Sequence, residues 1–192
     1  MDADTASTVR SKLIWFGIVS LASIILWIST AWIINPWFNF QTGALSALGS
    51  PGANDPWVYN VGLMFTSILI VVYSAGLIMY SRNVIQNVGV SFFIVAAMFL
   101  ALIGIYHGGT YPHDFVSMWF FIQADLSIII WGAGTFPYRK LIGSYSIAIA
   151  LLATFLAYAL NWPSSAELEI FGTCAISLWV VITVFFARKG KL

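Results

Sequence analysis

Long apolar stretches separated by short polar ones run through almost the whole chain. A helix needs roughly 20 apolar residues to cross a hydrocarbon core of about 30 Å. Apolar runs of this length favour helices, because a chain inside the membrane must pair its backbone N–H and C=O groups with one another. The sequence therefore predicts an all-α, polytopic membrane bundle of six transmembrane helices, over about 13–34, 57–80, 88–106, 115–134, 141–160 and 170–187. We expect residues 1–192 to form a single membrane domain, with its longest loop at 35–56 on the outer side.

Composition agrees with this pattern. The chain is 60% hydrophobic and only 8% charged, whereas soluble domains are about 25% charged. The first apolar run follows a basic flank, as in a signal peptide, but it is too long for a signal core, and no small-residue cleavage site follows it. We expect it to be retained as the first span of an integral membrane protein.

The basic residues fall on one side of the predicted topology. Every Lys and Arg lies in a terminal segment or in a linker after the second or fourth span: Arg10, Lys12, Arg82, Arg139, Lys140, Arg188, Lys189 and Lys191. By the positive-inside rule, this predicts a cell-membrane protein with cytoplasmic N and C termini. The net charge of +1 and the lack of a phosphate-binding loop make nucleic acid an unexpected partner.

Asp125 is the acid that the sequence places deepest in the membrane. It lies near the middle of the fourth predicted span, where an ionised carboxylate costs at least about 2.5 kcal/mol and usually has a function. No Lys or Arg occurs in any predicted span, so we expect Asp125 to be neutral or to face a wet cavity. Asp114, eleven residues earlier, falls on nearly the same helix face. A structural hydrogen bond is the alternative role for Asp125.

Two histidines bracket the third outer loop, which reads HGGTYPHD. His113, with Asp114 beside it, is a candidate general base, metal ligand or pH sensor, and His107 is a weaker candidate. Both side chains can instead simply sit among headgroups. A zinc site needs a further ligand, and Cys174, the only cysteine, lies inside an apolar run. We therefore predict no metal and no cofactor.

Asn60 begins a polar stripe on the second predicted span, with Ser67 and Ser74 following at intervals of seven residues. Such a stripe can line a cavity or can bind neighbouring helices through hydrogen bonds, which is the commoner use in membrane bundles. We treat Asn60 and Ser46 as candidate ligand-binding residues, together with His107, His113 and Asp125.

Two segments carry a resemblance, LSALGSPGANDPWVYNVGLM and GIYHGGTYPHDFVSMWFF. They resemble a widespread prokaryotic and archaeal family of six-span membrane proteins known only as a domain of unknown function. The positions that fit are Ser46, Leu48, Gly49, Asn60, Gly104, Pro112 and His113, whereas Ala47 stands where the family often has an acid. That family is similar in outline to FRAG and DRAM type membrane proteins, some of which are linked to lipid remodelling. The resemblance implies a lipid-facing role.

The leading hypothesis is a membrane protein whose outward-facing polar and aromatic cavity binds a membrane lipid or another amphiphile, without clear signs of catalysis. The cavity is expected between the first and third outer loops and the second and fourth spans, with aromatic residues at its mouth: Trp37, Phe38, Phe40, Trp57, Tyr111 and Trp119. Three alternatives stay open. The chain can be an accessory subunit of a larger membrane complex, a lipid-remodelling hydrolase that uses His113 with Asp114 or Asp125, or a proton-coupled transporter.

Overall fold

The computed structural model describes residues 3–192, and within that range all regular structure is helical. The elements are α1 (Ala3–Leu13), α2 (Phe16–Ile33), the short 3-10 helix η1 (Leu45–Gly49), α3 (Pro56–Tyr80), α4 (Val84–Ile105), α5 (His113–Thr135), α6 (Lys140–Ala159) and α7 (Ser165–Arg188). Counting α1 and α2 together as 4–33, six helices among the described residues are long and apolar enough to cross a membrane. The prediction of an all-α protein with six spans is confirmed.

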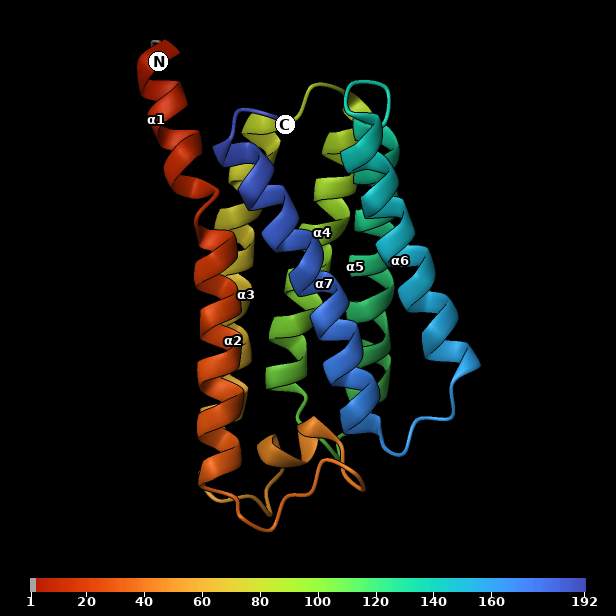
Figure 1. The fold of residues 1–192 in the computed structure, drawn as a ribbon. Helices are drawn as coiled ribbons and strands as arrows, with labels where there is room; N and C mark the ends of the chain where they lie inside the picture. Colours follow the sequence, from red (N-terminus) through yellow and green to blue (C-terminus); the bar gives the residue numbers. More distant parts are fainter. Residues whose placement is uncertain (1–2) are drawn as a thin grey trace.

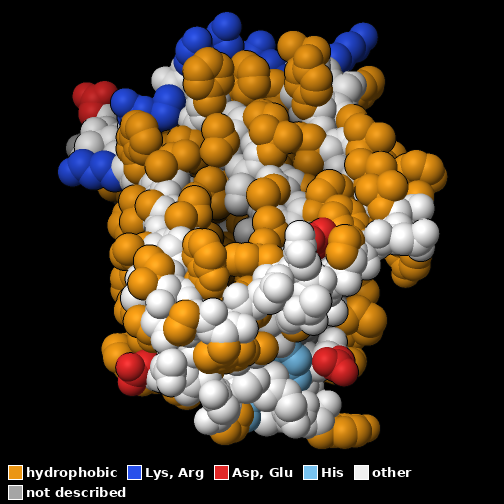
Figure 2. Space-filling model, turned by 60° about the horizontal axis from the view of Figure 1, so that its bottom comes forward, with side chains coloured by type: hydrophobic (Ala, Val, Ile, Leu, Met, Phe, Trp, Pro, Cys, Tyr) orange, Lys and Arg blue, Asp and Glu red, His pale blue; other side chains and the backbone are white. Residues whose placement is uncertain are grey.

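Consecutive long helices run in opposite directions, and both termini lie at one end of the bundle (Figure 1). We call this end the basic end, because the Lys and Arg side chains gather there (Figure 2). The other end carries the two histidines and the connections 34–55, 106–112 and 160–164, and we call it the loop end. The predicted segregation of basic residues is therefore present in the fold.

Three helical stretches begin at least four residues before the hydropathy pattern predicts. The predicted polar tail is helical from Ala3 onward as α1, and its first two residues lie outside the described part of the chain. Helix α4 begins at Val84 because the Asn83 side chain accepts a hydrogen bond from the Gln86 amide at 2.9 Å. Ser164 caps α7 in the same way. Polar capping residues extend a helix beyond its apolar stretch.

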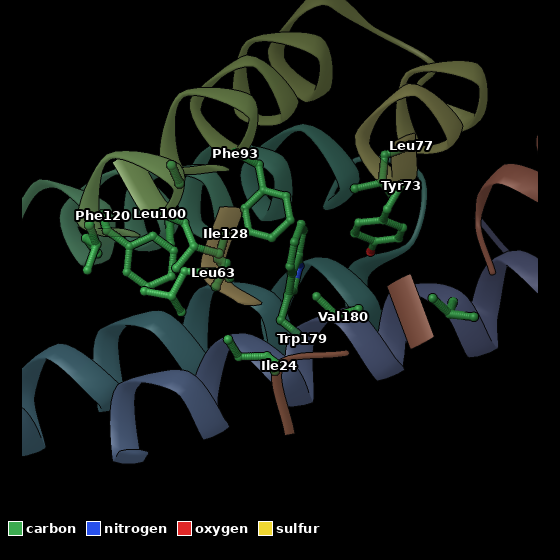
Figure 3. Packing of buried hydrophobic residues seen from close by; sticks show 14 of the residues in the cluster. Ile24, Leu63, Tyr73, Leu77, Phe93, Leu100, Phe120, Ile128, Trp179 and Val180 are labelled. Carbon is green, nitrogen blue, oxygen red and sulfur yellow. The ribbon is translucent and has the colours of Figure 1, made fainter. Parts of the chain in front are cut away.

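A cluster of buried aromatic rings joins α3, α4, α5 and α7 in the interior. Figure 3 shows Tyr73, Phe93 and Trp179 within it. The ring of Phe93 meets Tyr73 and Trp179 edge to face, with centroids 6.1 and 5.2 Å apart, and Trp179 meets Trp131 at 5.7 Å. Edge-to-face contacts add to the packing energy of such large side chains. The cluster fixes α7 against the middle of the bundle.

Helices α5 and α6 lie close together near the basic end and separate toward the loop end. A Cβ at Gly132 would lie 2.9 Å from the Cβ of Ser146, and a Cβ at Gly143 would lie 2.6 Å from the Phe136 backbone. Small residues of this kind let two helix backbones approach. The buried residues of α6 are Ile142, Gly143, Ser146 and Ala150, and none of them lies beyond the middle turn of the helix. The second half of α6 leans away from the bundle (Figure 1).

Candidate functional site

The separation of α6 leaves a cavity of about 840 Å³ between α5, α6 and α7, which we call the chamber. Its walls are mainly apolar, and its polar side chains come from α5, α6, α7 and η1. The residues that line it are Ala44, Ser46, His113, Asp114, Ser117, Met118, Phe121, Ile122, Asp125, Leu126, Ile128, Ile149, Ala150, Ala153, Thr154, Ala157, Tyr158, Ser165, Leu168, Glu169, Phe171, Gly172, Ala175 and Ile176.

A second, smaller cavity of about 80 Å³ lies deeper in the bundle. It is lined by residues of α2, η1, α3, α4, α5 and α7, and it shares Ser46, Ser117, Phe121, Glu169 and Ile176 with the chamber. The two spaces therefore adjoin at the loop end. The second and fourth predicted spans, now α3 and α5, meet around this small cavity. Within the described chain, none of the residues that line the chamber comes from α3.

His113 is the first residue of α5 and is 7% exposed. Its Nδ1 lies 2.7 Å from the carbonyl oxygen of Tyr106. A carbonyl oxygen only accepts hydrogen bonds, so Nδ1 must carry the proton of this bond. In the neutral ring Nε2 is then the free acceptor, and its contact is the Ser117 hydroxyl at 3.5 Å. His113 thus presents a basic nitrogen to the chamber in a fixed orientation.

Glu169 lies one and a half turns into α7 and lines both cavities. Its Oε2 accepts a hydrogen bond from the Leu45 amide at 2.8 Å, which ties α7 to η1. The carboxylate also lies within electrostatic range of His113 and of the Tyr59 hydroxyl. Glu169 and His113 therefore form a polar pair where the chamber and the small cavity meet.

Asp114 and Asp125 both line the chamber. This agrees with the prediction that the two residues share one face of the helix. Asp114 is exposed near the loop end, in the first turn of α5. Asp125 lies deeper, and its Oδ2 accepts a hydrogen bond from the Thr154 hydroxyl at 2.7 Å. This bond links α5 to the second half of α6, where the two helices have separated.

Ser46 also lines both cavities. It belongs to η1, which other loop-end groups hold in place. The Ser50 hydroxyl donates to the Ser46 carbonyl at 3.2 Å and reaches the Gly108 carbonyl at 3.1 Å. Leu48 is fully buried beneath this short helix. Ser46 therefore lies in a short, well-anchored helix at the place where the two cavities adjoin.

Asn60 and His107 lie away from the chamber. The Asn60 amide donates to the Gly49 carbonyl at 2.9 Å and so fixes the end of η1, while its own Oδ1 is buried without a hydrogen-bond partner. The ring Nδ1 of His107 lies 3.0 Å from the Gly108 carbonyl, within its own loop. In the described chain, neither residue lines either cavity. Their contacts support the loops around the site.

Three of the six aromatic residues expected at the mouth, Trp37, Phe38 and Phe40, pack on one another instead. Phe40 meets Trp32 at 5.1 Å and Phe38 at 5.0 Å between ring centroids, and Phe38 meets Trp37 at 6.2 Å. Trp119 stacks on Phe99 at 6.4 Å. None of the six predicted mouth aromatics is among the described residues that line either cavity. The aromatic groups of the chamber are Phe121, Tyr158 and Phe171.

Glu169 lies in the site, although the predicted sixth span begins at 170 and so leaves Glu169 in the preceding loop. A signal for its position exists in the stretch SSAE, because Ser164 followed three residues later by Glu167 is a capping-box pattern that marks a helix start. The Ser164 hydroxyl does accept from the Glu167 amide at 3.1 Å. A helix that starts there makes Glu169 part of α7, so that its side chain can face the bundle.

The chemistry available at the loop end is hydrogen bonding and proton transfer. His113 offers a base, Glu169 and Asp114 offer carboxylates, and Ser46 and Ser117 offer hydroxyls. Among residues 3–192, no three His, Cys, Asp or Glu side chains come together in a way that could hold a metal ion.

The comparison with protein families gives one match. A family model described as "Protein of unknown function (DUF998)" matches residues 18–185, which include every residue that lines the chamber. No curated protein and no solved structure matches the chain.

Proposed function

The chain belongs to this family of proteins of unknown function, and on the geometry of its chamber we propose that it binds a membrane lipid or another amphiphile. The observation that carries the proposal is the chamber itself. Its volume of about 840 Å³ lies in the range of about 300–1,000 Å³ that small-molecule sites occupy. A space of that size accommodates a headgroup and part of an acyl or isoprenoid chain.

The distribution of polar and apolar groups supports an amphiphile rather than a water-soluble ligand. His113, Asp114, Glu169 and Ser46 gather at the loop end, where a headgroup would meet water. Apolar side chains continue along the walls, among them Ile122, Leu126, Ile149, Ala153 and Ile176. Polar groups at one end and apolar walls beyond them match the two parts of a lipid.

Access from the membrane is provided by α6. From Leu151 to Ala159 this helix contributes no buried residue, and its large side chains there, such as Leu151, Leu152 and Phe155, are exposed. In a bilayer these side chains contact lipid tails. A lipid can then enter the chamber beside the second half of α6 without crossing the polar loops.

We place the protein in the cell membrane with its basic end, and hence both termini, in the cytoplasm. The support is the positive-inside rule applied to the basic end. Alkaline phosphatase, which is active only outside the cytoplasm, tests this orientation as a fusion partner. A fusion after Leu192 should be inactive, and an insertion after Gly52, in the exposed loop of the other end, should be active. The reverse result would refute the orientation.

The test of lipid binding is native mass spectrometry of protein extracted gently from its own membrane. The wild-type chain should carry a lipid at fixed stoichiometry. Ala153→Phe should lose this adduct, because Ala153 lines the chamber and the added ring would occupy it. Leu151→Phe is the matched control, since Leu151 lies on the same helix, is exposed and does not line the chamber.

Two results would refute the proposal. One is an adduct that persists unchanged in Ala153→Phe, which would place the lipid on the outer surface. The other is the absence of a specific lipid together with partner proteins at a fixed ratio. That second result would instead identify the chain as a subunit of a larger complex.

A lipid-remodelling hydrolase is a second candidate, favoured by the orientation of His113. Its Nδ1 is bound to the Tyr106 carbonyl, so Nε2 faces the chamber and is available as a general base. Under this hypothesis His113→Ala abolishes turnover of the bound lipid and leaves the protein inserted. His107→Ala, a histidine outside the chamber, should retain turnover. Equal turnover in both variants would remove this candidate.

A further inference from the structure

We propose that the chamber selects amphiphiles whose headgroup carries a positive charge, such as an amine or a quaternary ammonium group. This inference rests on the proposed lipid binding and adds the chemical class of the ligand. It follows from which charged groups line the chamber, from how they are held and from where the apolar walls lie.

The chamber contains acids and no permanent cation. Asp114, Asp125 and Glu169 line it, while among residues 3–192 no Lys or Arg does. The Lys and Arg side chains gather at the opposite end of the bundle (Figure 2). A headgroup at the loop end is thus separated from them by most of the membrane thickness.

His113 does not supply the missing positive charge. Its ring is 7% exposed and lies within electrostatic range of Glu169. In the neutral ring Nδ1 donates to the Tyr106 carbonyl and Nε2 is an acceptor, so the ring adds no charge there. Asp114 remains beside it as an acid, and no Lys or Arg is among the described residues that line the chamber.

The energetic consequence differs sharply for the two signs of headgroup. A phosphate or carboxylate headgroup would lie beside carboxylates of the same sign, and among the described residues that line the chamber it would find no lysine or arginine to pair with. An ammonium group in the same place can pair with Glu169 or Asp114. Because Glu169 is partly buried, its interaction with a charged headgroup is screened less than it would be in water.

The geometry places the headgroup at the loop end and the tail in the deeper part. Asp114 and Glu169 lie in the first turns of α5 and α7. Asp125 follows Asp114 by eleven residues, a distance of about 16 Å along the helix at 1.5 Å per residue, and is already bonded to Thr154. Asp114 and Glu169 are therefore the headgroup ligands, and the tail extends past Asp125 toward Ile128 and Ala150.

Competition between lipids with identical tails tests the selectivity. The delipidated full chain is offered equal amounts of dioleoyl-trimethylammonium-propane, dioleoyl-phosphatidylglycerol and dioleoyl-phosphatidylcholine, and bound lipid is read by native mass spectrometry. The cationic lipid should be bound at least tenfold more than the anionic one. The same preference should be absent from Ala153→Phe, in which the chamber is filled.

Charge-neutralising variants locate the selectivity. Glu169→Gln keeps an acceptor oxygen for the Leu45 amide, so the fold should survive, and the preference should fall to threefold or less. Asp114→Asn is the second variant, at an exposed position where no folding defect is expected. Glu167→Gln is the matched control, because Glu167 lies two residues from Glu169 and outside the chamber. It should keep the tenfold preference.

The outcomes separate this inference from the function on which it rests. If all three lipids bind equally, or if phosphatidylglycerol binds best, and binding is still lost in Ala153→Phe, charge selection is refuted and lipid binding stands. Charge selection by the chamber would also be refuted if the preference fell as much in Glu167→Gln as in Glu169→Gln. The selectivity would then reflect the charge of the protein surface. If no lipid binds to the wild-type chain, both proposals fail.

Discussion

The two halves of α6 meet the rest of the bundle in different ways. In the first half, Gly143 and Ser146 lie against α5 so closely that no larger side chain would fit. In the second half, Ala153 and Ala157 are also small, yet they line the chamber. The same class of residue therefore closes the gap between helices at one end and leaves it open at the other.

The difference lies in what the partner helix presents. At the basic end a glycine of α6 meets a glycine of α5, because a Cβ at Gly143 would lie 2.7 Å from the Gly132 carbonyl oxygen. Along the chamber α5 contributes the larger Met118, Phe121, Ile122 and Leu126. Close approach requires small residues on both helices. A stripe of small residues on only one of the two helices leaves a cavity between them.

The largest effect is expected from enlarging Gly143. Gly143→Leu should destabilise the protein by about 3 kcal/mol, since an overpacked contact forces backbone or side chains to move. Ala157→Leu, on the same helix but in the chamber, should change stability far less. Thermal unfolding in detergent, followed by the loss of helical circular dichroism, measures both. Equal destabilisation would mean that the two halves do not differ in packing.

The next largest effect is expected from a ligand bound in the chamber, beside the second half of α6. A chamber ligand at a hundred times its dissociation constant should stabilise the wild-type chain by about 2.7 kcal/mol. Ala153→Phe should show no such gain, because its chamber is filled. The measurement is the shift of the unfolding midpoint with added lipid. An equal shift in the variant would show that the lipid acts elsewhere.

A smaller effect is expected where α7 forms the other wall of the chamber. The Ser164 hydroxyl accepts from the Glu167 amide and also donates to the Phe40 carbonyl. Ser164→Ala should cost about 1 kcal/mol, as is typical for losing a helix cap. Hydrogen exchange at residues 164–168 should become faster. Ser165→Ala is the control, and a similar increase there would argue against the cap.

The smallest effect is expected from the hydrogen bond between Asp125 and Thr154, which spans the gap between α5 and α6. Side-chain hydrogen bonds between membrane helices average about 0.6 kcal/mol. A double-mutant cycle with Asp125→Ala and Thr154→Val should give a coupling of that size. A coupling of zero would mean that the bond does not hold the open half together.

The number of spans and the grouping of basic residues could be predicted because hydrophobic length and charge are local properties of the sequence. The starts of α4 and α7 depended on polar caps at Asn83 and Ser164, which hydropathy does not register. For the same reason Glu169 was assigned to a loop. Capping patterns in the sequence would have corrected these starts.

The position of the chamber could not be predicted in the same way. It depends on the angle between α5 and α6, which is set by the contact of Gly132 with Gly143 and by the support that α7 receives from Trp179. Gly132 and Gly143 lie on consecutive helices and Trp179 lies on a third, and no periodic pattern links them. The sequence did place Asp114 and Asp125 on a common face, because that relation lies within one helix.

Mechanically, the two halves of α6 are supported unequally. The first half packs on α5 through Gly143 and Ser146, whereas beyond Ala150 the helix has no buried residue and is joined to α5 by the hydrogen bond between Thr154 and Asp125. At 1.5 Å per residue the part beyond Ala150 is roughly 14 Å long, so a rotation of about 5° at its start moves its tip by less than 2 Å. If the chamber takes up lipid as proposed, its width should respond to the lateral pressure of the surrounding bilayer, so that the lipid composition around the protein would influence binding.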